Sequence, residues 1–425
     1  MKILVCDDDA ERSKEVVAAI AQGRRGDDAP PSALLSDALR DALDVVFARA
    51  RDALANPTTF ESDAVSPFDD VDLVLFDNNL AHLHKTGARL TAEEVIGYVR
   101  AFTSARYIVS LNKNPDVDFD LRYLVGDFDT RADLALNTEH LRNPALWSGD
   151  PKDAEKDFCP WYWPALNRAG DLRAAQVAMI QPNPDASVFA TIGFPTDPNA
   201  LAFLSHHAKG ALYPLSVERP EEGAKLIQDV TFRDVFIAKT RSLPVEDERK
   251  DLAAARTAAM DDVIARVVAA DLELWFRRDV VGPQELLVDA PHLATRMPVL
   301  LGEKAKRADD WNRTAADQEP PFGFDGDIYE KFVAAARYSN DAWTHHAAFW
   351  WPSLKANDEL STLFFNSVAD YPDVVFCEDR SGFVVKTGGE GDPVDFLAEF
   401  ESSWARRYVA KIGGFKYLPL SRFMM

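Results

Sequence analysis

Short apolar runs that end in acidic side chains mark the first third of the chain. A run over residues 3–6 passes directly into Asp7 and Asp8, and a second run over residues 73–76 ends at Asp77. Continuous apolar runs of this length are typical of strands that are buried on both faces of a parallel sheet. The carboxyl ends of such strands share one edge of the sheet, so we expect the acids to gather there.

Helical patterns alternate with these runs. The spacing of apolar positions predicts helices over residues 11–22 and 35–50 and from residue 91, and further strands over residues 107–111 and 133–137. Thr91 and Glu94 form a capping-box pattern at one helix start, whereas residues 45–47 also suit a short strand. Strands that alternate with helices favour an α/β fold with a doubly wound, five-stranded parallel sheet.

Beyond about residue 150 the pattern changes to a mainly α-helical one, rich in aromatic residues. It predicts a long helix over residues 246–278, another over 328–350, and a small β-hairpin formed by residues 374–377 and 383–386. We therefore predict two parts, a domain over residues 1–150 and a mainly helical region over residues 151–425, with a sub-boundary near 240–246. The apolar stripe of the long helix can also pair with a helix of a second chain, so an oligomer stays an alternative.

Composition narrows the classes of function. The chain has 425 residues, a formal net charge of −22 and 47% hydrophobic residues, as expected for a soluble globular protein. So negative a field disfavours nucleic-acid binding, because nucleic acids are polyanions. No signal peptide and no membrane-spanning run is evident. Cys6, Cys159 and Cys377 have no metal-binding spacing, so we expect free thiols and a cytoplasmic location.

The acidic strand ends carry a resemblance to a known family. The runs ILVCDDD, LVLFD and YIVSLN resemble the receiver domain of two-component response regulators, over residues 1–145. The resemblance implies a flavodoxin-like fold and a Mg²⁺ site at Asp7, Asp8 and Asp77. It also implies that Asp77 accepts a phosphoryl group and that the Ser110 hydroxyl senses it.

Physical chemistry is consistent with that assignment. A carboxylate that attacks a phosphoryl group approaches a dianion, so a divalent cation is needed to neutralise the charge. Mg²⁺ prefers oxygen ligands and keeps several waters, so two or three carboxylates suffice. A phosphoryl group on Asp77 would carry nearly two negative charges, a large local perturbation.

The chain lacks one cationic side chain that the family pattern leads us to expect. The family places a lysine after its fifth strand, whereas the strand predicted over residues 133–137 leads into Thr138 and Glu139. Lys113, in a KxP-like pattern after the fourth strand, is the candidate substitute. This departure leaves open a pseudo-receiver, in which the acids serve folding or partner contact without phosphorylation.

A second family offers a rival interpretation. Asp7 and Asp9 match the DxD motif of haloacid-dehalogenase-like phosphatases, with Ser110 as the second motif and Asp127 with Asp129 as the late acidic motif. That family also builds a Mg²⁺ site at strand ends. Its motif usually continues into a Gly-Thr turn, whereas here the following residues open a helix.

These observations favour a cytoplasmic signalling or regulatory protein rather than an enzyme. The first domain would accept phosphate or bind a protein partner, either a histidine kinase or a subunit of a larger complex. The helical region would transmit that state through protein–protein contacts. A basic stretch over residues 402–425, in an otherwise acidic chain, would dock on the acidic body of this protein, on a protein partner or, less readily, on nucleic acid.

Overall fold

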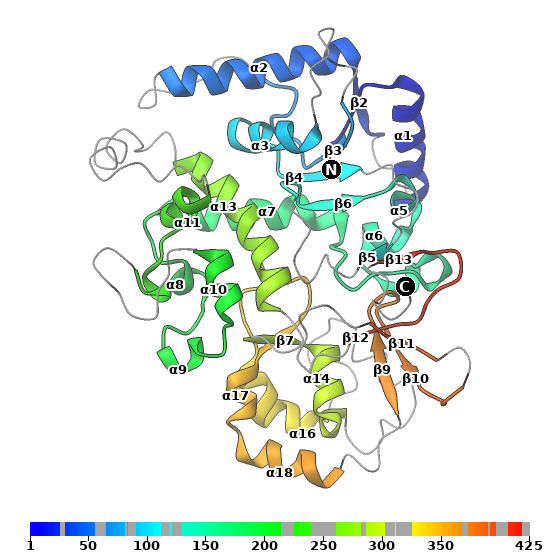
Figure 1. The fold of residues 1–425 in the computed structure, drawn as a ribbon, viewed down its shortest axis with the longest axis vertical. Helices are drawn as coiled ribbons and strands as arrows, with labels where there is room; N and C mark the ends of the chain where they lie inside the picture. Colours follow the sequence, from blue (N-terminus) through cyan, green and yellow to red (C-terminus); the bar gives the residue numbers. More distant parts are fainter. Residues whose placement is uncertain are drawn as a thin grey trace.

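The structure is a computed structural model with an amino-terminal α/β part and a mainly helical remainder (Figure 1). It describes residues 1–25, 30–55, 65–80, 83, 91–111, 119–120, 130–213, 225–239, 261–281, 286–301, 311, 325–367, 373–389, 392–396 and 407–418. Among these residues no helix is both long enough and apolar enough to span a bilayer.

A five-stranded parallel sheet forms the centre of the amino-terminal part. Its order is β2-β1-β3-β4-β6, and every neighbouring pair is parallel. Taken in chain order, this is the 2-1-3-4-5 arrangement of flavodoxin-like folds. The strands are β1 (Ile3–Asp7), β2 (Ser32–Leu35), β3 (Leu73–Asp77), β4 (Tyr107–Leu111) and β6 (Leu134–Leu136). The predicted doubly wound α/β fold is therefore confirmed.

Helices cover both faces of this sheet because the strand side chains alternate between two apolar cores. On one face, Leu4, Val74 and Ile108 pack with α2 (Ser36–Ala55) and α3 (Ala92–Phe102). The opposite core contains Val5, Leu75 and residues of four further helices, which are α1 (Ala10–Arg24), α5 (Thr138–Arg142), α6 (Pro144–Ser148) and α7 (Leu166–Ile180). Figure 1 shows α2 and α3 on one side of the strands and α1 at their edge.

The second strand differs from the sequence prediction. Residues 45–47 do not form a strand, because they lie in the middle of α2, where Val46 is buried against the sheet. The strand is instead β2, whose side chains are exposed or half-buried. An edge strand of this kind lacks the continuous apolar run that marks the central strands.

Close packing holds α1 against the following helices. Gly23 lies in its last turn, and a Cβ atom there would come within 2.1 Å of the Leu141 carbonyl oxygen and 2.5 Å of Trp147 Nε1. That indole nitrogen itself donates to the Leu141 carbonyl at 2.7 Å. The absence of a side chain at residue 23 therefore permits the contact of α1 with α5 and α6.

The remaining part is mainly helical, as predicted. Its α-helices are α7 (Leu166–Ile180), α8 (Val188–Ile192), α9 (Pro198–Leu201), α10 (His206–Leu212), α11 (Phe232–Lys239), α13 (Asp261–Trp275), α14 (Ala290–Arg296), α16 (Gly326–Ile328), α17 (Trp351–Lys355) and α18 (Asp358–Ser367). Short 3₁₀ turns are η2 (Pro151–Asp153), η3 (Glu155–Asp157), η4 (Ile227–Asp229), η7 (Pro298–Leu301) and η9 (Ala334–Ala336), and π-helical turns are η6 (Phe276–Val280) and η8 (Tyr329–Val333).

Small sheets accompany these helices. The predicted hairpin is present as β9 (Val374–Cys377) and β10 (Gly382–Val385), and β12 (Arg407–Val409) and β11 (Val394–Phe396) extend it to four strands. A separate antiparallel pair joins β7 (Leu287–Asp289) to β8 (Ala348–Trp350). A second pair, which is parallel, joins β13 (Tyr417–Leu418) to β5 (Phe119–Asp120).

Two of the predicted helices differ in length from the helices of the structure. The helix expected over residues 328–350 is wrong beyond Ala336, because the chain turns back and the Tyr338 N–H donates to the Ala348 carbonyl at 2.8 Å. Buried aromatic residues in this turn, such as Trp343, imitate helical spacing. Within 246–278, α13 confirms the helix over Asp261–Trp275, while residues 246–260 and the sub-boundary near 240–246 lie outside the described residues.

One apolar core draws on residues from both sides of residue 150. The core on the α1 side of the sheet includes Phe158, Tyr162 and Trp163, together with Val409 near the other end of the chain. Phe415 stacks on Phe158 with ring centroids 3.9 Å apart. The division into residues 1–150 and 151–425 stays a prediction.

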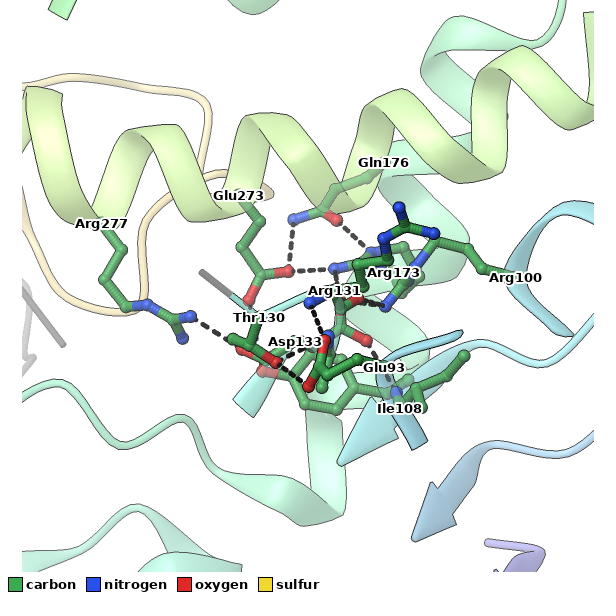
Figure 2. Close-up of polar contacts among 12 residues, drawn as sticks. Glu93, Arg100, Ile108, Thr130, Arg131, Asp133, Arg173, Gln176, Glu273 and Arg277 are labelled. Atoms are coloured by element: carbon green, nitrogen blue, oxygen red, sulfur yellow. Dashed lines mark hydrogen bonds and ion pairs between the residues drawn. The ribbon is translucent and has the colours of Figure 1, made fainter. Parts of the chain in front are cut away.

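Buried charged side chains join the sheet to two helices of the carboxyl-terminal region (Figure 2). Arg173 on α7 donates to Asp133 Oδ1 at 2.9 Å and to Glu273 Oε2 on α13 at 2.7 Å. Asp133 precedes β6, and its Oδ2 accepts the Ile108 N–H of β4 at 2.7 Å. Arg100 of α3 also pairs with Asp133, at 3.0 Å. Each buried charge thus faces an opposite charge, as burial requires.

Further groups complete this network. Gln176 donates to Glu273 and to the Ala342 carbonyl, at 3.4 and 2.7 Å, and Arg277 donates to the Asp133 carbonyl at 2.7 Å. Burial opposes ionisation of Glu273, but the Arg173 guanidinium and the His345 ring outweigh it and hold the pKa of Glu273 well below its usual range. The network therefore carries full charges inside the protein.

Removing one member of this network is expected to destabilise the protein strongly. Arg173→Met leaves Glu273 buried without its main cation, so we expect a loss of about 3–5 kcal/mol in the free energy of unfolding. The measurement is the urea midpoint of unfolding, followed by circular dichroism. Lys14→Met is the control, because it removes an exposed pair with Glu11 and should cost less than about 1 kcal/mol. Equal midpoints for the two variants would contradict the expectation.

Candidate functional site

Three carboxylates meet at the carboxyl edge of the sheet. Asp7 ends β1, Asp8 follows it, and Asp77 ends the neighbouring strand β3. Each offers one oxygen atom, and these oxygens all lie within 4.8 Å of one another. Asp7 and Asp77 are buried and Asp8 is half-buried. The structure therefore brings together the three acids that the sequence analysis placed at one site.

Local hydrogen bonds fix the turn that presents Asp7 and Asp8. Asp9 caps α1, since its carboxylate accepts the backbone N–H groups of Glu11 at 2.9 Å and Arg12 at 3.3 Å. Its own N–H donates to Asp7 Oδ1 at 2.9 Å. The Ser36 hydroxyl, at the start of α2, donates to the Asp8 carbonyl at 3.1 Å. Asp9, the third acid of the run, therefore serves as the N-cap of α1.

An arginine that the sequence analysis missed enters this acidic pocket. The Arg12 guanidinium approaches both oxygens of Asp77, with Nη2 2.8 Å from Oδ1 and Nη1 3.2 Å from Oδ2. Its Nε lies 3.8 Å from Asp7 Oδ2. The sequence signal was its place three residues after the helix-capping Asp9, which puts it in the first turn of α1, beside the strand ends.

Burial and like charges change the acidity of the pocket. Burial raises the pKa of Asp77 to about 7; Arg12 opposes this shift, and Asp7 and Asp8 add to it. Burial also raises the pKa of Asp7, although the N–H of Asp9 and the Arg12 guanidinium favour its charged form. Three carboxylates and one guanidinium therefore leave the pocket with an excess of negative charge when the acids are ionised.

The other predicted site residues lie in different positions. Ser110 is buried in β4, where the register pairs it with Phe76, while Asp77 is paired with Leu111. Residues in register on neighbouring strands point to the same face of the sheet, so Ser110 is on the face of Phe76. Side chains alternate along a strand, so this is not the face of the next residue, Asp77. Its role as a switch hydroxyl stays a prediction. Lys113 lies outside the described residues, as do Asp127 and Asp129 of the rival phosphatase motif.

The position of the family's lysine is occupied by a helix cap. Asn137 follows β6, and its side-chain oxygen accepts the His140 N–H of α5 at 2.9 Å. The helix continues with Thr138 and Glu139, so no lysine follows this strand. The cation that demonstrably contacts Asp77 comes instead from α1.

The donor set suits a small divalent cation. All three side chains offer carboxylate oxygens, which are the ligands that Mg²⁺ prefers, and a Mg²⁺ ion keeps several water ligands beside them. Asp7, Asp8 and Asp77 would hold it. The chemistry it would supply is charge neutralisation at an incoming phosphoryl group.

The raised pKa of Asp77 predicts a pH dependence of stability. An acid whose folded pKa exceeds its unfolded value of about 4 binds more protons when folded, so its contribution to stability falls as the pH rises from about 4 to about 7. The Asp77→Asn substitution removes the titrating group, and with it this decline in the free energy of unfolding. We expect the variant to exceed the wild type by about 2 kcal/mol at pH 8, after part of the gain is lost with the Arg12 contacts.

Urea unfolding from pH 4 to pH 8 in metal-free buffer tests this expectation. Asp171→Asn is the matched control, because Asp171 is an exposed acid on α7. Parallel stability–pH curves for the wild type and Asp77→Asn would show that folding does not raise the pKa of Asp77.

Comparison with known proteins identifies no family for this chain. The chain matches no protein-family model, no curated protein and no solved structure. What the structure shows is the parallel α/β fold and the cluster of three acids at the edge of its sheet.

Proposed function

We propose that this is a regulatory protein whose receiver-like domain accepts a phosphoryl group on Asp77. The carrying observation is the convergence of three carboxylate oxygens within 4.8 Å at the carboxyl edge of the sheet, where open α/β folds bind ligands. Asp7, Asp8 and Asp77 would hold Mg²⁺. Asp77, as the buried acid at the end of the central strand β3, is the nucleophile.

The reaction needs the Asp77 carboxylate, a divalent cation and a phosphoryl donor. One oxygen of the ionised Asp77 carboxylate attacks the phosphorus atom of the donor, a P–O bond forms, and the bond to the leaving oxygen breaks. With a pKa of about 7, ionised Asp77 is present near neutral pH, so the nucleophile is available. The predicted partners of the phosphoryl oxygens stay Ser110, which the register places on the sheet face of Phe76, and Lys113, which lies outside the described residues.

The structure suggests how such a state would reach the helical region. β4 borders the acidic pocket at Leu111, which is paired with Asp77. Near its other end, the N–H of Ile108 is bound to Asp133 of the buried network, and Asp133 contacts Arg173 on α7. We propose that the output passes through these contacts to a protein partner, either a kinase or a complex subunit.

A second candidate function is an interaction protein with a silent pocket. The two contacts of Arg12 with Asp77 favour it, because a guanidinium already neutralises the carboxylate that would accept phosphate. The phosphatase interpretation is weaker, because the carboxylate of Asp9, its expected acid, accepts two helix N–H groups. In the silent case, Asp77→Asn would leave partner binding unchanged.

Incubation with acetyl phosphate and Mg²⁺, followed by intact-mass spectrometry, tests phosphorylation. We expect one phosphoryl adduct on the wild type, none on Asp77→Asn, and an unchanged adduct on Asp171→Asn, whose carboxylate is exposed on α7. Removal of Mg²⁺ by a chelator should abolish the adduct, because the pocket then keeps its negative charge.

A known receiver protein in the same reaction serves as the positive control. If that control is labelled and the wild-type chain is not, the phosphorylation proposal is rejected and the interaction protein remains. An adduct that persists in Asp77→Asn would place the acceptor at another residue.

A further inference from the structure

We propose that Arg12 is a built-in counter-cation that competes with a divalent metal ion for the carboxylate of Asp77. The inference rests on the proposed function, because it concerns the metal site of the same pocket. It adds a regulatory role for a residue of α1 that the resemblance to receiver domains does not assign.

The geometry shows why the two cations compete. The two terminal nitrogens of Arg12 each contact a different oxygen of Asp77, at 2.8 and 3.2 Å. A metal ion that binds an Asp77 oxygen must therefore share or replace one of these contacts. Both Asp77 and Asp7 are buried, so water screens the repulsion between the two cations poorly.

The backbone limits how Arg12 can move away from Asp77. Its N–H is bound to the capping carboxylate of Asp9, and the far end of α1 is held by the close approach of Gly23 to Leu141 and Trp147. The helix is thus anchored at both ends, and the side chain of Arg12 has to rotate away from Asp77. The Arg12 side chain is 13% exposed, so part of it already lies at the surface.

Two states of the pocket follow from this arrangement. Without metal, Arg12 offsets part of the charge of the three acids, so the strand ends tolerate their proximity. With metal, the two positive charges of the ion would offset most of the charge of the three acids, and the guanidinium would be displaced from Asp77. Arg12 therefore lowers the affinity for the metal ion and sets the concentration at which the pocket is filled.

Calorimetric titration of the full chain with Mg²⁺ alone, at pH 8, tests the inference. Arg12→Gln should bind Mg²⁺ about tenfold more tightly than the wild type, which corresponds to removal of one competing charge-assisted hydrogen bond. Arg12→Lys keeps the charge but loses the two-pronged contact, so a smaller gain is expected. Lys14→Gln is the matched control, since Lys14 lies on the same helix and pairs with the exposed Glu11.

The outcomes separate this inference from the proposed function. Equal affinities for the wild type and Arg12→Gln, weaker binding by Arg12→Gln, or equal tightening by Lys14→Gln would each overturn the role of Arg12 and leave the metal site in place. Absence of Mg²⁺ binding in every variant would overturn the metal site as well. If Arg12→Gln does not fold, Arg12→Lys decides, and an unchanged affinity there overturns the inference.

Discussion

The guanidinium of Arg173, held between Asp133 and Glu273, is the interaction on which the arrangement of this protein depends. It is almost fully buried, and so are both of its carboxylate partners. A buried charge is tolerated only when its partners are in place, so the network penalises any shift of α7 or α13 against the sheet. Apolar packing alone is less selective, because apolar side chains repack at modest cost. The network thus gives the two parts one relative position.

The strand β4 is shared by this network and the acidic pocket. Five residues long, it extends over about 13 Å from the first Cα atom to the last. Its Ile108 N–H is bound to Asp133, and its Leu111 lies in register with Asp77. The two charged clusters differ in balance, since arginines outnumber the acids in the network, whereas acids outnumber Arg12 in the pocket. An added cation is therefore accommodated in the pocket rather than in the network.

Local pattern was sufficient to predict four of the five strands of the sheet and the meeting of its acids. Apolar runs ending at Asp7 and Asp77 identify central strands, and parallel topology then brings their ends together. The network could not be foreseen in this way, because Arg173 meets Glu273 across 100 residues of chain. Arg12 lay within reach of sequence reasoning, yet the direction of its side chain depends on how α1 packs. The edge strand β2 was missed because its half-exposed residues have no apolar run.

The core on the α1 side of the sheet also has a consequence for biosynthesis. Phe158, Tyr162 and Val409 belong to that core, and Phe415 stacks upon it. Chains are made from the amino terminus at about 5–20 residues per second. The ribosome therefore completes all five strands of the sheet long before it supplies the last residues that cover them. During that interval the nascent sheet exposes apolar surface, a period in which a chaperone or a second chain would find it accessible.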